Sequence, residues 1–269
     1  MNKRIAIFGC GWLGLPLAQS LVNKGYFVQG STTSENKLDL LKNKGISPYL
    51  ISISENGVHG DMGAFLTEVS VLVVNIPPKL RGNSQENYVQ KMQLLHSEVK
   101  RYGVEQLIFV SSTSVYGDVQ GEVTEKTVPK PTTESGKQLL ASENIFRTST
   151  NLKTTIIRFG GLIGEDRHPI KMLAGRTGLT NGNEYVNLIH QNDCITIIEH
   201  IITERWWNQI FNGVFPYHPT KSVYYSSEAI KRGLQSPEYE VNKAVIGKKI
   251  VPVALLNVKG FLFNTAIFS

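Results

Sequence analysis

The beginning of the chain combines a short apolar run, three closely spaced glycines and an amphipathic stretch. The run Arg4–Phe8 leads directly into Gly9-Cys-Gly11-Trp-Leu-Gly14, and apolar side chains recur at helical spacing over Leu13–Lys24. A strand, a glycine turn and a helix in this order are typical of a dinucleotide-binding βαβ unit. The first glycine permits the tight turn, the second lets the backbone approach a pyrophosphate, and the third lets helix and strand pack closely. We therefore expect phosphates at the N-terminus of this helix, with a tight turn that binds nothing as the weaker alternative.

Strand-like and helix-like segments alternate through the first half of the chain. Such alternation predicts an α/β fold, an NAD(P)-binding Rossmann fold with a doubly wound parallel sheet. After Gly161 the pattern loosens, so we expect a dinucleotide-binding domain over residues 1–165 and a smaller substrate-binding lobe over residues 166–269, interleaved with it. The expected strands cover residues 27–30, 48–53, 71–75, 106–111 and 154–159, and the expected helices cover 38–44, 85–102, 135–147 and 193–203.

The composition limits the class of protein. The 269 residues include 41% hydrophobic side chains and carry a net charge of +6, but the lysines are scattered. We therefore expect an anionic small-molecule substrate and no nucleic acid. No apolar run is long enough to span a membrane, and the glycines of the turn interrupt any signal peptide, so we expect no membrane attachment and a cytoplasmic location. Cys10 and Cys194 lack the spacing of a zinc site, and we expect no metal.

Hydroxyl groups and a lysine follow the second expected strand, where NAD-preferring proteins carry Asp or Glu. Residues 30–34 read Gly-Ser-Thr-Thr-Ser, and Lys37 lies one turn further on. An acidic residue here would accept a hydrogen bond from the ribose of NAD, whereas hydroxyl and ammonium donors suit the 2′-phosphate of NADP. We expect NADP in preference to NAD, although the same residues also suit the N-terminal cap of the next helix.

The fifth expected strand runs into residues 111–117, which read Ser-Ser-Thr-Ser-Val-Tyr-Gly. Together with residues 158–164 (Arg-Phe-Gly-Gly-Leu-Ile-Gly) and 187–193 (Asn-Leu-Ile-His-Gln-Asn-Asp), this segment closely resembles the extended short-chain dehydrogenase/reductases, the sugar-nucleotide epimerase/dehydratase family. The resemblance spans most of the chain. It implies that Ser112 is the serine that hydrogen-bonds the reacting hydroxyl or carbonyl. It also implies that Ser114 and Tyr116 face the same pocket.

The helix that follows departs from this family. The family begins it with Tyr-x-x-x-Lys, in which the tyrosine is the acid/base and the lysine lowers its pKa. A match anchored on Pro131 and Glu143 puts Ser135 in place of the tyrosine and Leu139 in place of the lysine, while Lys137 points to another face of the helix. The chain thus resembles an atypical branch of the family, which implies a fold and a cofactor far better than a reaction.

Two residues are candidates to replace the missing acid. Tyr116 is the expected donor, with Ser112 polarising the substrate oxygen, and a role as a pocket wall is its alternative. His168 lies beside Arg167 after the sixth expected strand, where ligands bind in open α/β sheets. An Arg-His pair suits an anionic substrate, and a surface turn before Pro169 is the alternative.

Two classes of function follow. One is an NADP-dependent oxidoreductase, epimerase or dehydratase that acts on a nucleotide-linked or similar anionic sugar, if necessary with a different proton donor. The alternative is a catalytically inactive dinucleotide-binding regulator or sensor.

By analogy with the family, the helices expected over 85–102 and 135–147 would form a homodimer interface. The expected cofactor contacts are Gly9, Gly11, Trp12, Leu13, Gly14, Ser31, Thr32, Thr33, Lys37, Asn75, Ile76, Pro77, Pro78, Ser111, Gly160 and Gly161, and the expected substrate contacts are Ser114, Arg167, His168 and Asn187.

Overall fold

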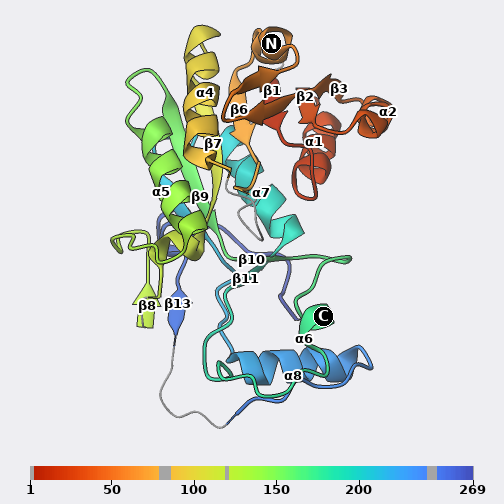
Figure 1. Cartoon of the computed structure of the whole chain (residues 1–269), viewed down its shortest axis with the longest axis vertical. Helices are drawn as coiled ribbons and strands as arrows, with labels where there is room; N and C mark the ends of the chain where they lie inside the picture. Colours follow the sequence, from red (N-terminus) through yellow and green to blue (C-terminus); the bar gives the residue numbers. More distant parts are fainter. Residues whose placement is uncertain (1–2, 79–85, 119–120, 241–246, 269) are drawn as a thin grey trace. The chain divides into compact units, whose positions relative to one another are not determined.

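The computed structural model describes residues 3–78, 86–118, 121–240 and 247–268, and the chain divides into two compact units (Figure 1). The first unit consists of Met1–Val115, Pro131–Ile157 and Ile195–Ile210. The second unit consists of Tyr116–Lys130, Arg158–Cys194 and Phe211–Ser269. The units therefore interleave along the chain.

A seven-stranded parallel sheet confirms the expected α/β fold. Its strands lie in the order β12-β9-β7-β6-β1-β2-β3, so the chain reverses direction across the sheet between β1 and β6, as in a doubly wound fold. The strands are β1 (Arg4–Phe8), β2 (Phe27–Thr32), β3 (Ser47–Leu50), β6 (Val71–Val74), β7 (Gln106–Ser112), β9 (Lys153–Phe159) and β12 (Ile210–Gly213).

The central strands of the first unit are apolar because helices cover both faces of the sheet. In the register, Ile7 lies opposite Gly30 of β2 and Val73 of β6, and all four residues of β6 are inaccessible to solvent. Helices α4 (Tyr88–Arg101) and α5 (Glu134–Arg147) lie side by side (Figure 1). Helix α1 (Gly14–Asn23) is tied to residues 195–203 of α7 (Gln191–Thr203) by the buried Glu199, which accepts hydrogen bonds from Ser20 and Lys24.

The third expected strand is shorter than the sequence suggested. Strand β3 ends at Leu50, and the chain then forms a hairpin of β4 (Ser52–Ser54) and β5 (Gly57–His59). The two strands pair antiparallel with Ser54 opposite Gly57, so a two-residue loop joins them. The prediction of one strand over 48–53 was therefore wrong for its last residues.

The second unit has its own small core. Buried residues Ile163, Ile170, Leu188 and Tyr224 form part of one apolar cluster with Ile267. Its elements are β8 (Gly121–Val123), β10 (Gly161–Ile163), α6 (Ile170–Leu173), β11 (Leu188–His190), α8 (Lys221–Lys231) and β13 (Lys248–Ile250). The remaining elements of the chain are η1 (Glu35–Lys37), α2 (Leu38–Asn43), α3 (Met62–Leu66), η2 (Thr113–Tyr116) and η3 (Ala254–Val258).

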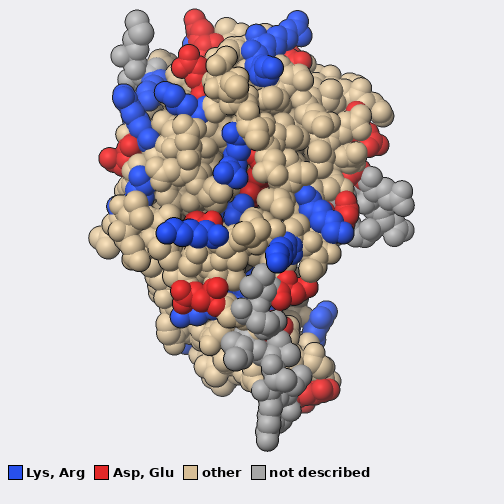
Figure 2. Space-filling view, turned by 90° about the vertical axis from the view of Figure 1, so that its left-hand side faces the viewer, with Lys and Arg blue, Asp and Glu red and all other residues tan. Residues whose placement is uncertain are grey.

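The charged residues are distributed rather than gathered. On the face drawn in Figure 2, Lys and Arg side chains form separate groups, with Asp and Glu among them. A surface that binds nucleic acid usually presents its basic residues as one patch or stripe. Within the described ranges, no helix is both long enough and apolar enough to cross a bilayer.

Two glycines of the turn provide a matched test of its packing. A β-carbon at Gly14 would lie 2.1 Å from the carbonyl oxygen of Gly9, whereas one at Gly11 would meet nothing within 4 Å. We expect Gly14→Ala to lower the free energy of unfolding by roughly 1–3 kcal/mol because the turn must move away from α1. Gly11→Ala should leave the free energy of unfolding unchanged or slightly higher. Urea unfolding of both variants, followed by circular dichroism, measures the difference. Equal stability of the two variants would contradict this packing.

Candidate dinucleotide site

A cavity of about 220 Å³ lies in the first unit, at the carboxyl ends of β1, β2 and β6. These strand ends are where open α/β sheets bind ligands. The cavity brings together nine of the expected cofactor residues: Gly9, Gly11, Ser31, Thr32, Thr33, Lys37, Asn75, Ile76 and Pro77. It is also lined by residues that the sequence did not single out as cofactor contacts, namely Phe8, Cys10, Ser34, Ile51, Ser52, Ile53, Tyr88 and Lys91. Half of these additional residues lie on β4 and α4, which only the folded chain brings next to the glycine turn.

The glycine turn is shaped for a close approach of backbone to a ligand. Gly9 has a φ of +108°, a conformation that residues with a side chain rarely adopt. A β-carbon added to Gly9 would lie 2.7 Å from the carbonyl oxygen of Asn75. Gly11 lies on the cavity wall with open space where a side chain would stand. Helix α1 starts at Gly14, so the positive end of its dipole follows the turn directly. The turn therefore fits a pyrophosphate.

Side chains from two strands hold the Gly9 residue in place. The amide of Gly9 donates to the hydroxyl oxygen of Ser31 at 3.0 Å. The side-chain amide of Asn75 donates to the carbonyl oxygen of Gly9 at 3.1 Å. Ser31 is buried, whereas Thr33 and Lys37 are exposed at the rim of the cavity.

The polar end of the cavity carries cations and hydroxyls. Among the residues that the structure describes, those lining it include Lys37 and Lys91 but no carboxylate. Burial raises the pKa of the Cys10 thiol to about 12, and the nearby positive charge of Lys37 acts in the opposite direction. The ammonium of Lys37 is therefore within electrostatic reach of the glycine turn. Lys91 forms an ion pair with Glu86 at the start of α4.

Several expected cofactor residues do not line this cavity. Leu13 and Gly14 are buried under the turn, and Ser111 donates a 2.6 Å hydrogen bond to the buried carboxylate of Glu143. Gly160 and Gly161 belong to the second unit, where the amide of Gly161 donates to the carbonyl oxygen of Asn187. Trp12 and Pro78 are half-buried outside the cavity lining.

The serine-rich segment lies against the start of α5 in the first unit. The hydroxyl oxygen of Ser112 accepts a hydrogen bond from the amide of Ser114. A β-carbon at Gly136 would lie 2.8 Å from the carbonyl oxygen of Ser114, so only glycine allows this approach. Ser135 is half-exposed in the first turn of α5, and Leu139 is buried one turn later.

Tyr116 is enclosed in the second unit. Its side chain is inaccessible to solvent, and its hydroxyl donates to Asn212 at 2.8 Å and accepts from Arg158 at 3.0 Å. The Arg158 guanidinium also stacks on the ring, 4.9 Å from its centroid. Burial raises the pKa of Tyr116, and the charge of Arg158 opposes the shift. This geometry favours a wall residue over a proton donor.

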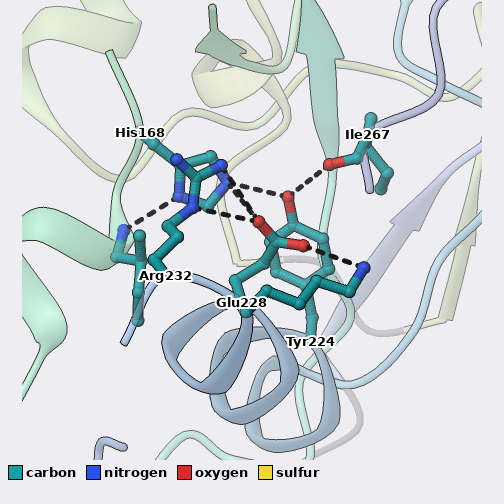
Figure 3. Close-up of polar contacts among 7 residues, drawn as sticks. His168, Tyr224, Glu228, Arg232 and Ile267 are labelled. Atoms are coloured by element: carbon teal, nitrogen blue, oxygen red, sulfur yellow. Dashed lines mark hydrogen bonds and ion pairs between the residues drawn. The ribbon is translucent and has the colours of Figure 1, made fainter. Parts of the chain in front are cut away.

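His168 is not part of a surface turn. It is buried in the second unit, where its Nδ1 accepts from the amide of Ile170 and its Nε2 lies 3.0 Å from the hydroxyl of Tyr224 (Figure 3). Because Nδ1 is an acceptor, neutral His168 carries its proton on Nε2 and donates it to Tyr224. Tyr224 in turn donates to the carbonyl oxygen of Ile267. Arg167 beside it is exposed.

A buried carboxylate completes this cluster. Glu228 of α8 is inaccessible to solvent and lies 3.7 Å from His168 Nε2. Arg232 donates to the same carboxylate oxygen from Nε and Nη2, at 3.2 and 3.1 Å (Figure 3). Burial lowers the pKa of His168 to about 4, helped by the positive charges of Arg232 and Lys171 and opposed by Glu228. His168 is therefore neutral at pH 7.

Asn187 has a clear structural role. Its side-chain amide donates to the carbonyl oxygen of Lys248 at 2.8 Å, and its side-chain oxygen accepts from the amide of Ile250. These bonds attach β13 to the segment before β11. Nowhere in the described ranges do three His, Cys, Asp or Glu side chains gather closely enough to hold a metal ion.

The fold and the glycine turn define an NAD(P)-binding protein of Rossmann type. The NAD(P)H-binding family matches residues 9–186, and the chain belongs to this family. It is 36% identical over 239 residues to Protein YeeZ of Escherichia coli (strain K12), covering 88% of this chain and 86% of YeeZ.

Solved structures with the same fold include nucleotide-sugar epimerases and a short-chain dehydrogenase/reductase superfamily protein from Agrobacterium tumefaciens. The Bordetella bronchiseptica enzyme WbmG in complex with NAD matches with a TM-score of 0.81 at 15% identity, over 99% of this chain and 91% of that chain. The UDP-glucuronic acid 4-epimerase from Bacillus cereus in complex with NAD matches with a TM-score of 0.79 at 18% identity, over 98% and 92% of the two chains.

The buried histidine makes stability depend on pH. Because the pKa of His168 falls from 6.5 in the unfolded chain to about 4, the unfolded chain binds the proton first as the pH is lowered. His168 therefore contributes its full stability above pH 6.5 and loses it as the pH falls toward 4. The loss is on the order of 3 kcal/mol, at about 1.4 kcal/mol per pKa unit.

Replacement of this histidine by glutamine should flatten that dependence. We expect the difference in free energy of unfolding between the wild type and His168→Gln to shrink steadily from pH 7 to pH 4.5. His59→Gln, at an exposed position, is the matched control and should leave the slope unchanged. A His168→Gln profile parallel to that of the wild type would show that His168 does not titrate in this range.

Proposed function

We propose that this chain is an NADP(H)-dependent enzyme of the epimerase/dehydratase type, with a nucleotide-linked or similarly anionic sugar as its substrate. The observation that carries the proposal is the cavity beside the glycine turn, which is lined by Lys37 and Thr33 and by no carboxylate. When bound, the nicotinamide supplies or accepts a hydride. The family match and the epimerase neighbours support a reaction of this class.

The residues of the first unit fit the dinucleotide in separate roles. The open space at Gly11 suits the pyrophosphate, and the apolar side chains of Ile51, Ile53 and Ile76 suit an adenine ring. Lys37 and Thr33, at the end of β2, suit the 2′-phosphate of NADP because both are exposed donors.

Lys37 provides the test of cofactor choice. We expect Lys37→Ala to weaken NADPH binding by roughly 1–3 kcal/mol, because a charge-assisted hydrogen bond is lost, and to change NADH binding little. Lys42→Ala is the control, since this exposed lysine on α2 does not line the cavity. Fluorescence titration of both cofactors measures the effect. Equal NADPH and NADH affinities in the wild type would refute the preference for NADP.

For the chemistry, we propose that Ser112 polarises the reacting oxygen and that Tyr116 is a wall residue. Tyr116 is fully buried, and its hydroxyl already has two partners. The sequence-based assignment of Tyr116 as the donor would require it to release Asn212 or Arg158 before it could reach a substrate.

The alternative function is an inactive dinucleotide sensor. It is favoured by the burial of Tyr116 and His168, the two candidate proton donors, and by the buried Leu139 at the position where the family has its lysine.

A screen of NADPH with sugar nucleotides, by thermal shift and by turnover, tests the enzyme proposal. With a substrate in hand, we expect Ser112→Ala to lower turnover by about 10²–10³-fold, as loss of a donor to a developing oxyanion does. Tyr116→Phe should lower stability by about 1–3 kcal/mol through its unpaired partners and change turnover only slightly. A loss of 10² or more in folded Tyr116→Phe would make Tyr116 the donor. Tight NADPH binding without turnover of any sugar nucleotide would favour the sensor.

A further inference from the structure

We propose that Ser31 and Asn75 are positioning residues that pin the Gly9 residue from opposite sides, rather than direct contacts of the cofactor. The inference rests on the dinucleotide site proposed above. Each side chain is committed to a backbone group of the turn: Ser31 accepts from the amide of Gly9, and Asn75 donates to its carbonyl oxygen.

The backbone around the turn reinforces the same clamp. The amide of Cys10 donates to the carbonyl oxygen of Ser31 at 2.8 Å, and the amide of Asn75 donates to the carbonyl oxygen of Phe8 at 2.9 Å. Strands β2 and β6 therefore each hold the end of β1 through one backbone and one side-chain bond. Gly9 has no freedom to rotate without breaking a bond on one side.

The clamp holds Gly9 at its φ of +108°. Glycine adopts positive φ readily but has more backbone freedom than any other residue, so partners on both sides are needed to fix one conformation. With Gly9 held, the turn and the start of α1 keep one backbone geometry before any ligand arrives. Such preorganisation increases affinity because less ordering is needed on binding. Ser31 and Asn75 would then act on the pyrophosphate through the turn.

The clamp and a direct contact predict different ligand dependence. We expect Ser31→Ala and Asn75→Leu each to weaken NADPH binding about 5- to 10-fold, while 2′-AMP, which has no pyrophosphate, binds within threefold of its wild-type affinity. Ser31→Thr, which keeps the hydroxyl, should retain NADPH affinity. The double variant should lose less than the product of the single losses, because one released side already frees the turn. An equal loss for NADPH and 2′-AMP would overturn the proposal in favour of direct contact.

Hydrogen exchange tests the clamp without any ligand. In the ligand-free wild type, the amide of Gly9 should be protected by its bond to Ser31, and its exchange should be at least tenfold faster in Ser31→Ala and Asn75→Leu. The amides of α4 should keep their wild-type rates in all variants, which identifies any variant that is simply unfolded. Unprotected Gly9 in the wild type would overturn the clamp. Absence of NADPH and NADH binding by the wild type would instead refute the proposed function, because the exchange result stands independently.

Discussion

The approach of α1 to the glycine turn is the constraint on which the first unit depends. The α-carbon of Gly14 lies so close to the carbonyl oxygen of Gly9 that a β-carbon there would be 2.1 Å from it. This contact sets the N-terminus of the helix against the end of β1, directly after the glycine turn that lines the cavity. The flanking strands β2 and β6 then contribute the side chains that hold the turn. A phosphate site can therefore form from backbone alone, provided that the packing of two glycines is preserved.

The second unit uses its polar residues differently. Tyr116, Arg158 and Asn212 form one buried set of hydrogen bonds, and His168, Tyr224 and Glu228 form part of another. A polar group inside a protein is costly unless it has partners, and these side chains have partners among neighbouring side chains and backbone groups. Tyr116 and His168, whose residue types suggest acid–base chemistry in the sequence, are buried in the interior of this unit. Burial is the main cause of the shifts in their pKa values. A shifted pKa can therefore arise from a structural position as well as from a catalytic role.

The elements that the sequence placed well are those with strong local patterns. Strand β6 is apolar throughout, and α4 has Tyr88, Met92, Leu95 and Val99 at helical spacing, so both were expected close to their observed bounds. Helix α8 was missed because its buried face is made of two tyrosines, a glutamate and an alanine, while Val223 and Ile230 are exposed. A search for aliphatic residues at helical spacing misses a helix whose valine and isoleucine are exposed and whose buried face includes a glutamate.

The sequence by itself determined the glycine turn, the alternation of strands and helices, and the hydroxyls and lysine that follow β2. These features depend on neighbours within a few residues, and local geometry decides them. Only the tertiary structure decided which polar side chains reach the cavity and which are enclosed. Tyr116 meets Asn212, 96 residues away, and His168 meets Tyr224, 56 residues away. Ser31 and Asn75, 44 positions apart, meet on Gly9 because β2 and β6 flank β1. Contacts between residues so far apart in the sequence depend on how the strands and helices pack together. The pattern of residues within a short segment does not contain this information.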